Sequence, residues 1–360
     1  MALFSDTAIC MDMGSVSTRV ISGNRGELFT EATAVLTLRD DASKVLSVGN
    51  DAFRMYGKSG DDVIIRYPVQ DGAVTDSEMC ALYMVAMAEK AGRHRRTLDK
   101  AQLYFSVPQG LTKVERSALE QAARLMGTRR PAFVLSPLAA AIGAGLLTTE
   151  SKGTMAVTLG GSLTEIAVIS MNAIVAARSI RSGSLSMDDA IVRYMRRAKG
   201  LIIGERTAER LKVDIGTARL DGDRETNDAL PDSAAEPQDS DTTVTVKGRD
   251  ASTRDAKSVS VTKNDIAVAL RENIRMLVDA LRDALARTPV ALAGDISERG
   301  ILLSGGGANL DGLCELLSDM TGVPVHKSAH PEDDVGLGLK LLADDPRLLA
   351  SAIENGSAEM

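Results

Sequence analysis

Aromatic residues are scarce in this chain. Its 360 residues include no tryptophan and only five each of phenylalanine and tyrosine. A core of the size expected at this length must therefore be built from Leu, Ile, Val, Ala and Met. Long apolar runs are also missing, so we expect neither a secretory signal peptide nor a helix that crosses a bilayer.

Patterns typical of metal sites and of disulfide frameworks are missing as well. The cysteines are odd in number and lack metal-ligand spacing, and the histidines are scattered. These residues are Cys10, Cys80, Cys314, His94, His326 and His330. The pattern predicts reduced thiols in the cytoplasm and argues against a zinc site. A net charge of −7 argues against a general nucleic-acid binder.

Three turns rich in glycine and serine are the most informative features that are present. In Ile301–Leu310 an apolar strand runs into three consecutive glycines, and a helix is predicted to follow. Ile9–Val20 and Met155–Val168 each predict a strand, a small-residue turn and a second strand. Such turns expose backbone N–H groups that can hold a phosphate.

The two hairpin segments suggest an internal duplication. Gly14 and Gly160 stand at the same point of the two patterns, 146 residues apart. Two related domains would each present a hairpin to a shared cleft, where N–H groups and hydroxyls hold phosphates from two sides. The alternative is a pair of ordinary hairpins with no shared role.

Strands and helices alternate along the chain, which predicts an α/β fold with mixed sheets. Thr112 and Glu115 form a predicted capping box at the start of one helix. The predicted elements are a strand at Gln102–Val107, a helix from Thr112 to near Gly127, a strand at Phe133–Leu135, a helix at Leu138–Leu146 and a helix over Ile266–Leu285 closed by Pro289.

Two segments have an unusual charge. Asp221–Asp241 holds eight acidic residues against one basic residue and two prolines, which predicts a disordered surface loop. The loop is either an idle insertion or a docking site for a basic partner. Gly92–Arg96 is a basic loop, which is either merely solvated or meets anionic lipid or a partner.

Several stretches, in order along nearly the whole chain, resemble MreB, the bacterial actin that organises cell-wall synthesis. The stretches are Asp12–Ser15, Pro68–Val74, Val107–Arg116, Pro137–Gly145, Ile203–Glu209, Val246–Asp250 and the turn at Gly305. The resemblance implies the actin-like ATPase fold, an α/β architecture of two duplicated lobes, each of two subdomains, around a nucleotide cleft.

The resemblance also implies limits for the subdomains. They are 1–30, 65–143 and 328–345 for the core of the first lobe, 31–64 for its small subdomain, 144–178 and 262–327 for the core of the second lobe, 179–261 for its small subdomain with the acidic loop 221–241, and 346–360 for a C-terminal tail.

By the same resemblance, ATP or ADP binds in the cleft, and Asp12 holds Mg²⁺ through water. The implied nucleotide contacts are Asp12, Gly14, Ser15, Val16, Ser17, Gly160, Gly161, Ser162, Glu205, Arg206, Glu209, Lys212, Gly305, Gly306, Gly307 and Ala308.

The chain departs from the family pattern where the chemistry is expected. Ser136 stands in place of the catalytic Glu, Thr158 in place of an Asp and Leu163 in place of a Thr. Hydrolysis of a γ-phosphate needs an oriented water and a hydrated Mg²⁺ held by carboxylates. With Asp12 as the one acid of the expected set that remains, we expect the ATPase to be weak or lost.

The resulting hypothesis is an MreB-like filament or filament regulator that serves cell shape and the positioning of cell-wall synthesis. It would self-associate or co-assemble with a paralogous bacterial actin in the cytoplasm, and Leu3 and Phe4 would give a weak contact with the inner face of the membrane. Cell-wall synthesis proteins are implied partners. The alternatives are an ordinary, active filament-forming ATPase, or a monomeric chaperone or kinase of the same fold.

Overall fold

The computed structural model describes residues 8–22, 28–55, 58, 60–128, 131–219, 242–355 and 358–359. The expected acidic loop Asp221–Asp241 and the expected membrane contacts Leu3 and Phe4 lie outside these residues.

A six-stranded sheet is the centre of the first lobe, with the strand order β19-β10-β9-β1-β2-β3. Its strands are β1 (Ala8–Met13), β2 (Ser17–Ser22), β3 (Leu28–Ala32), β9 (Gln102–Val107), β10 (Ala132–Leu135) and β19 (Ala358–Glu359). β1 pairs antiparallel with β2 and parallel with β9. Because β1 is central, it is buried on both faces: Ile9 and Met11 pack with α2 (Ser77–Lys90) and α3 (Lys113–Met126), while Cys10 faces the other side.

A five-stranded sheet with a matching topology is the centre of the second lobe, in the order β13-β12-β11-β17-β18. Its strands are β11 (Thr154–Leu159), β12 (Thr164–Ser170), β13 (Ala173–Ile180), β17 (Ile301–Ser304) and β18 (Val325–Lys327). β11 pairs antiparallel with β12 and parallel with β17, as β1 does with β2 and β9. The two lobes therefore repeat one arrangement, as the spacing of the hairpins predicts.

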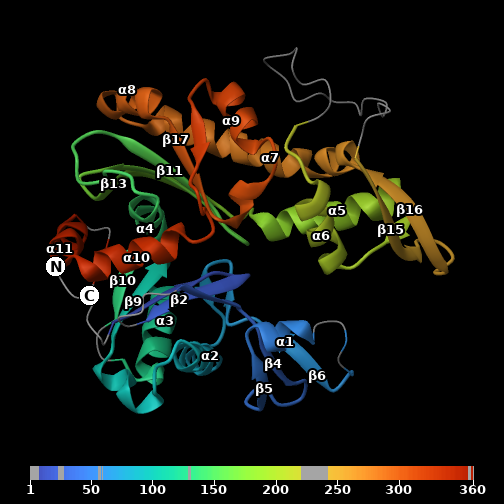
Figure 1. The fold of residues 1–360 in the computed structure, drawn as a ribbon, viewed down its shortest axis with the longest axis horizontal. Helices are drawn as coiled ribbons and strands as arrows, with labels where there is room; N and C mark the ends of the chain where they lie inside the picture. Colours follow the sequence, from blue (N-terminus) through green and yellow to red (C-terminus); the bar gives the residue numbers. More distant parts are fainter. Residues whose placement is uncertain are drawn as a thin grey trace.

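Each lobe carries a small sheet at the same end of the molecule (Figure 1). In the first lobe these elements are β4 (Val35–Leu38), β5 (Val45–Val48), β6 (Val63–Arg66) and α1 (Asn50–Arg54), followed by the ribbon of β7 (Val69–Gln70) and β8 (Ala73–Val74). In the second lobe they are β14 (Leu201–Ile202), β15 (Thr243–Asp250), β16 (Ala256–Thr262), α5 (Ser184–Ala198) and α6 (Glu205–Ile215). The residue limits of the four subdomains stay a prediction.

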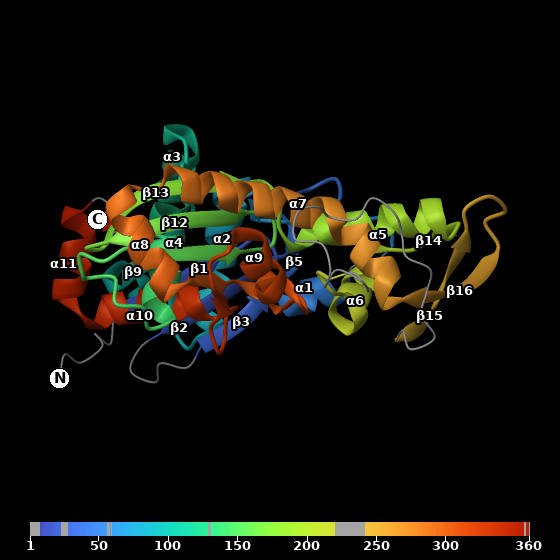
Figure 2. The same cartoon turned by 90° about the horizontal axis from the view of Figure 1, so that it is seen from above.

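The remaining helices cover the second lobe and join the two lobes. They are α4 (Ser136–Gly143), α7 (Lys263–Arg287), α8 (Val290–Arg299), α9 (Leu313–Thr321), α10 (Asp334–Asp344) and α11 (Pro346–Glu354). The long helix α7 lies along the molecule and packs on β12, β13 and β16, so it ties the small sheet of the second lobe to the large one (Figure 2).

Local signals in the sequence set most helix ends. Thr112 and Glu115 form the predicted capping box of α3, with the Glu115 N–H donating to Thr112 Oγ1 at 3.2 Å, and Gly127 ends the helix with φ +109°. The helix predicted over Leu138–Leu146 instead spans Ser136–Gly143. It starts earlier because proline is tolerated in the first turn, where its missing N–H has no helical partner to lose.

Between the two large sheets, α4 crosses α10 almost backbone to backbone (Figure 1). A Cβ added at Gly143 would overlap the carbonyl oxygen of Asp334, and one added at Gly338 would overlap that of Ala139. One buried cluster contains both helices together with Cys10 of the first sheet and Ala156 of the second. The glycines therefore let the two lobes share one core.

This crossing gives a first prediction. Replacing Gly338 with Ala should lower the free energy of unfolding by about 1–3 kcal/mol, because the added methyl group forces α4 and α10 apart. Chemical denaturation monitored by circular dichroism measures this change.

Gly294 in α8 provides the matched control, since a Cβ there meets no atom within 4 Å. Gly294→Ala should instead stabilise the chain, by up to about 1 kcal/mol, through helix propensity alone. Equal effects of the two substitutions would show that the crossing is not tight.

Candidate functional site

The predicted hairpins β1–β2 and β11–β12 end in turns of the same geometry. The N–H of Gly14 donates to the carbonyl oxygen of Ser17 at 3.0 Å, and that of Gly160 donates to Leu163 at 2.9 Å. In the described part of the chain, the N–H groups between these positions donate to no other backbone group. They belong to Ser15, Val16, Gly161 and Ser162. Each turn therefore offers two backbone donors, which is what an anion such as phosphate requires.

The two turns face each other and touch. The Oγ atoms of Ser15 and Ser162 are 2.7 Å apart, a hydrogen bond between the lobes. A Cβ added at Gly161 would lie 2.6 Å from Cγ2 of Val16, so only glycine fits there. The duplicated hairpins thus meet at one point of the cleft, as the sequence predicts.

The N-terminus of α5 holds the second turn in place. The N–H groups of Ser184 and Leu185 donate to the carbonyl oxygens of Gly160 and Gly161 at 2.9 and 2.8 Å. Gly183, which precedes the helix, is so close that a Cβ would overlap both carbonyls. Because the free donors of a helix start are satisfied by the turn itself, the turn has a fixed position relative to α5.

The third glycine turn closes the cleft from the side of β17. Gly305 has φ +85°, and a Cβ there would overlap the carbonyl oxygen of Leu159. Its N–H donates to the carbonyl oxygen of Pro331 at 2.7 Å. The glycine is required both by the backbone conformation and by the close approach of β11.

These turns line two adjoining cavities of about 200 and 460 Å³, which share Val16, Ser184 and Gly306. Of the residues predicted from the sequence, the first cavity is lined by Asp12, Gly14, Ser15, Val16, Ser17, Ser136, Thr158, Gly160, Gly161, Ser162, Leu163, Gly305 and Gly306. The second is lined by Val16, Glu209, Lys212, Gly306 and Gly307. Glu205, Arg206 and Ala308 line neither cavity.

Arg206 instead connects the two small subdomains. Its guanidinium lies over the ring of Phe53, 4.6 Å from the ring centroid, and donates to the carbonyl oxygen of Phe53. This contact joins α6 to α1 across the end of the cleft. One and two turns further along α6, Glu209 and Lys212 do face the second cavity.

Lys212 has a fixed position in that cavity. Its Nζ atom lies 2.8 Å from Oδ1 of Asp188 and donates to the carbonyl oxygen of Ser184 at 2.8 Å. Burial raises the pKa of Asp188 to about 6, although the charge of Lys212 acts in the opposite direction. The pair fixes the orientation of one cationic side chain beside the turns.

The acid stands on the first strand of the hairpin in the first lobe and on the second strand of the hairpin in the second lobe. Asp12 of β1 is paired in register with Arg19 of β2, whereas at the equivalent positions Thr158 of β11 is paired with Glu165 of β12. All four residues line the first cavity. Glu165 is therefore an acid of this cavity beyond the residues predicted from the sequence. It lies in the predicted hairpin segment Met155–Val168, two residues after Leu163.

Glu165 is buried and Asp12 is half-buried. Burial raises the pKa of Glu165 to about 7; the N–H of Gln109, which donates to its Oε1 at 2.7 Å, lowers the pKa, and the charge of Asp12 raises it. Burial also raises the pKa of Asp12, opposed by the hydroxyl of Ser106 at 2.6 Å and by the charge of Arg19. The first cavity thus holds two carboxyl groups that take up protons readily.

The residues at the family's catalytic positions lie beside these acids. Ser136 begins α4, and Thr158 Oγ1 is buried without a hydrogen-bond partner among the described residues. Leu163 ends the second turn and packs against Gly72 of the first lobe, which Pro108 also approaches. Neither hydroxyl carries a negative charge, so the acids on the strands of the two hairpins are Asp12 and Glu165.

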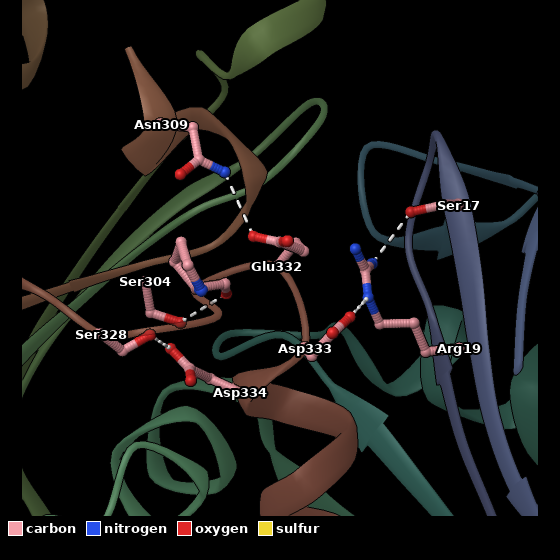
Figure 3. A network of polar contacts seen from close by, with 9 residues as sticks. Ser17, Arg19, Ser304, Asn309, Ser328, Glu332, Asp333 and Asp334 are labelled. Carbon is pink, nitrogen blue, oxygen red and sulfur yellow. Dashed lines mark hydrogen bonds and ion pairs between the residues drawn. The ribbon is translucent and has the colours of Figure 1, made fainter. Parts of the chain in front are cut away.

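A polar network links the first hairpin to the turn after β17 through the segment before α10 (Figure 3). Arg19 Nε lies 2.9 Å from Oδ1 of Asp333, and the same guanidinium donates to Oγ of Ser17 at 2.9 Å. Asn309 donates to Glu332 at 3.1 Å from the other lobe. The network fixes the position of one wall of the cleft relative to the other.

No helix among the described residues is long and apolar enough to cross a membrane, and those residues contain no group of three His, Cys, Asp or Glu side chains that could hold a metal by themselves. A divalent ion in this cleft would need ligand atoms from a bound phosphate.

The buried state of Glu165 gives a second prediction. Its carboxyl binds a proton more tightly in the folded chain than in the unfolded chain, where its pKa has the ordinary value of 4.5. The protonated carboxyl therefore contributes stability that is fully present below pH 4.5 and is lost as the pH rises through about 7. Between pH 5.5 and 8, the melting temperature should therefore fall in the wild type and fall by about 2 °C less in Glu165→Gln.

Differential scanning fluorimetry at fixed ionic strength measures these slopes. Glu298→Gln, an exposed change on α8, is the control and should keep the wild-type slope. Parallel slopes for the wild type and Glu165→Gln would contradict the prediction.

The chain also has known relatives. The family model described as "MreB/Mbl protein" matches residues 6–351. The chain is 34% identical to the cell shape-determining protein MreB of Escherichia coli K12, over 92% of this chain and 91% of the relative. It is 32% identical to the cell shape-determining protein Mbl of Bacillus subtilis 168, over 94% and 96%.

Solved structures agree with this relationship. MreB 5 of Spiroplasma citri bound to AMPPNP superposes with a TM-score of 0.85 at 25% identity, covering 97% of this chain and 98% of that one. The MamK double helical filament has a TM-score of 0.72 at 17% identity, covering 94% and 99%, and so supports the fold alone. The predicted actin-like α/β fold is confirmed, and the chain belongs to the MreB/Mbl family.

Proposed function

We propose that this protein is a nucleotide-binding cytoskeletal subunit that serves cell shape and the positioning of cell-wall synthesis, with a weak or lost ATPase. The observation that carries the proposal is the pair of matching turns, whose unpaired N–H groups meet across a cleft in an MreB/Mbl chain. The relatives named for cell shape supply the cellular role.

The two cavities suggest how ATP or ADP lies in the cleft. The phosphates lie at the Gly14 and Gly160 turns, where backbone donors converge. The nucleoside lies in the larger cavity beside Glu209 and Lys212. Asp12 would hold Mg²⁺ through water, with phosphate oxygens among the other ligands, because Mg²⁺ in such sites takes few protein ligands.

Slow hydrolysis follows from the residues beside the phosphates. Attack on a γ-phosphate needs a group that orients the water. Ser136 is short and uncharged, and Thr158 adds no charge to the shell of the metal. Positioning a water and stabilising the developing charge are each worth about a hundredfold or more in rate.

A slow but genuine ATPase is the second candidate, and Glu165 is the observation that favours it. This carboxyl lines the cavity and has a pKa of about 7, near the value at which a general base is most effective. If it orients the water, Glu165→Gln abolishes whatever turnover the wild type has.

Assembly needs complementary ends and does not need hydrolysis. A head-to-tail contact between identical subunits produces an open filament when the rotation does not close. Self-association, or co-assembly with a paralogous bacterial actin, is the expected mode of assembly.

The same proposal includes a location and further partners. The protein lies in the cytoplasm at the inner face of the membrane, which it contacts through Leu3, Phe4 and the Arg93–Arg96 loop. It also contacts cell-wall synthesis proteins. Arg93 is partly occupied, since it donates to Ser22 and to the carbonyl oxygen of Ala8.

A third prediction concerns turnover. The purified protein should release phosphate about a hundredfold or more slowly than an MreB that has the family's Glu, Asp and Thr. The combined change Ser136→Glu, Thr158→Asp and Leu163→Thr should raise the rate, because the surrounding turns are intact. A coupled phosphate-release assay measures both, and ordinary turnover in the wild type would refute the proposal of a weak ATPase.

A fourth prediction concerns assembly. The protein should form protofilaments, alone or with an active paralogue, that disassemble more slowly than those of an active MreB, because hydrolysis does not weaken their contacts. Light scattering, pelleting and electron microscopy of the pure protein and of the mixture test this. A strict monomer that also fails to enter the paralogue's filaments would end the filament proposal.

A further inference from the structure

We propose that Leu163 makes the cleft selective for nucleoside diphosphates over nucleoside triphosphates. The inference rests on the proposed nucleotide site and specifies its ligand. It depends on the position of Leu163, on the contacts that join the lobes around the smaller cavity, and on the charges of the cavity walls.

The position of Leu163 follows from the duplicated turns. Leu163 accepts the hydrogen bond that closes the second turn, as Ser17 does in the first. The first lobe thus has a hydroxyl at the fourth position of its turn, where the second lobe has a branched apolar side chain. That side chain cannot donate a hydrogen bond to a phosphate or bind a hydrated metal.

Leu163 reaches across the cleft to the first lobe. A Cβ added at Gly72, in the turn between β7 and β8, would lie 2.6 Å from Cδ1 of Leu163 and 2.8 Å from Cγ of Pro108. Gly72 has φ +75°, and the absence of a side chain leaves the room that the leucine fills. The space beyond the turns is therefore partly occupied by an apolar side chain from the opposite wall.

A second contact closes the cleft at the same level. The N–H of Gln109, next to Pro108, donates to the buried carboxyl of Glu165 on the strand that Leu163 precedes. Together with the hydroxyl pair of Ser15 and Ser162 in the turns, these contacts join the lobes around the smaller cavity. A phosphate chain that enters from the larger cavity reaches this barrier after the turns.

The charges of the smaller cavity favour the shorter phosphate chain. The described residues that line it include the acids Asp12, Glu115, Glu165 and Glu332, and one base, Arg19, which is already paired with Asp333. The larger cavity is lined by the lysines Lys212 and Lys263 and by the acids Glu209, Asp214 and Asp311. A third phosphate adds negative charge to the smaller cavity, where acids outnumber bases, so repulsion weakens the binding of the longer chain.

Isothermal titration calorimetry of the full chain, with ADP and with the triphosphate analogue AMPPNP at one Mg²⁺ concentration, tests the inference. The wild type should bind ADP at least about tenfold more tightly than AMPPNP. Leu163→Thr should tighten AMPPNP binding about fivefold or more and leave the affinity for ADP within about twofold. Leu163→Met, which keeps an apolar side chain of similar reach, is the matched control and should keep the wild-type ratio.

The outcomes separate this inference from the proposed function. Equal affinities of the wild type for the two nucleotides would overturn the selectivity alone and leave the nucleotide site standing. An unchanged ratio in a Leu163→Thr protein that melts like the wild type would show that Leu163 is not its cause. Binding of neither nucleotide would overturn the site itself.

Discussion

The near-contact of α4 and α10 is the constraint on which the rest of the structure depends. Two glycines, Gly143 and Gly338, let the backbones meet, and the shared core reaches both central sheets. Because α10 packs on the first large sheet and α4 on the second, the distance between the helices sets the distance between the sheets that carry the two hairpin turns. A wider crossing would separate the hydroxyls of Ser15 and Ser162, and with them the donors that face one ligand.

Duplication gives the cleft its symmetry, and divergence between the copies gives it its chemistry. Both turns have the same hydrogen bond and the same free donors, which suits binding. The strand positions below them differ: an acid and a base in the first lobe, a hydroxyl and an acid in the second. Binding depends on backbone geometry, which survives side-chain changes, whereas hydrolysis depends on particular side chains. A chain can therefore keep the first property and lose the second.

Contacts across the cleft tie the ligand site to the whole molecule. The hydrogen bond from Asn309 to Glu332 joins the lobes at the start of α10, and the stacking of Arg206 on Phe53 joins the small subdomains at the far end. A ligand bound between these two contacts would affect how the four subdomains are placed relative to one another. In a protein that assembles end to end, that placement determines whether successive subunits fit.

Residue pattern alone determined the elements and the turns of this protein. The strand at Gln102–Val107, the capping box at Thr112 and the paired hairpins depend on local rules of hydrogen bonding and backbone conformation, so they could be predicted. The resemblance to MreB added the fold and a set of site residues in the cleft, of which all but Glu205, Arg206 and Ala308 line the cavities.

Tertiary structure alone decided which of these residues meet. Gln109 donates to Glu165, Arg206 stacks on Phe53 outside the cavities, and Leu163 lies against Gly72. Each of these contacts joins segments more than 50 residues apart in the sequence. Local pattern does not encode such distances, because they arise only when two lobes pack on one core.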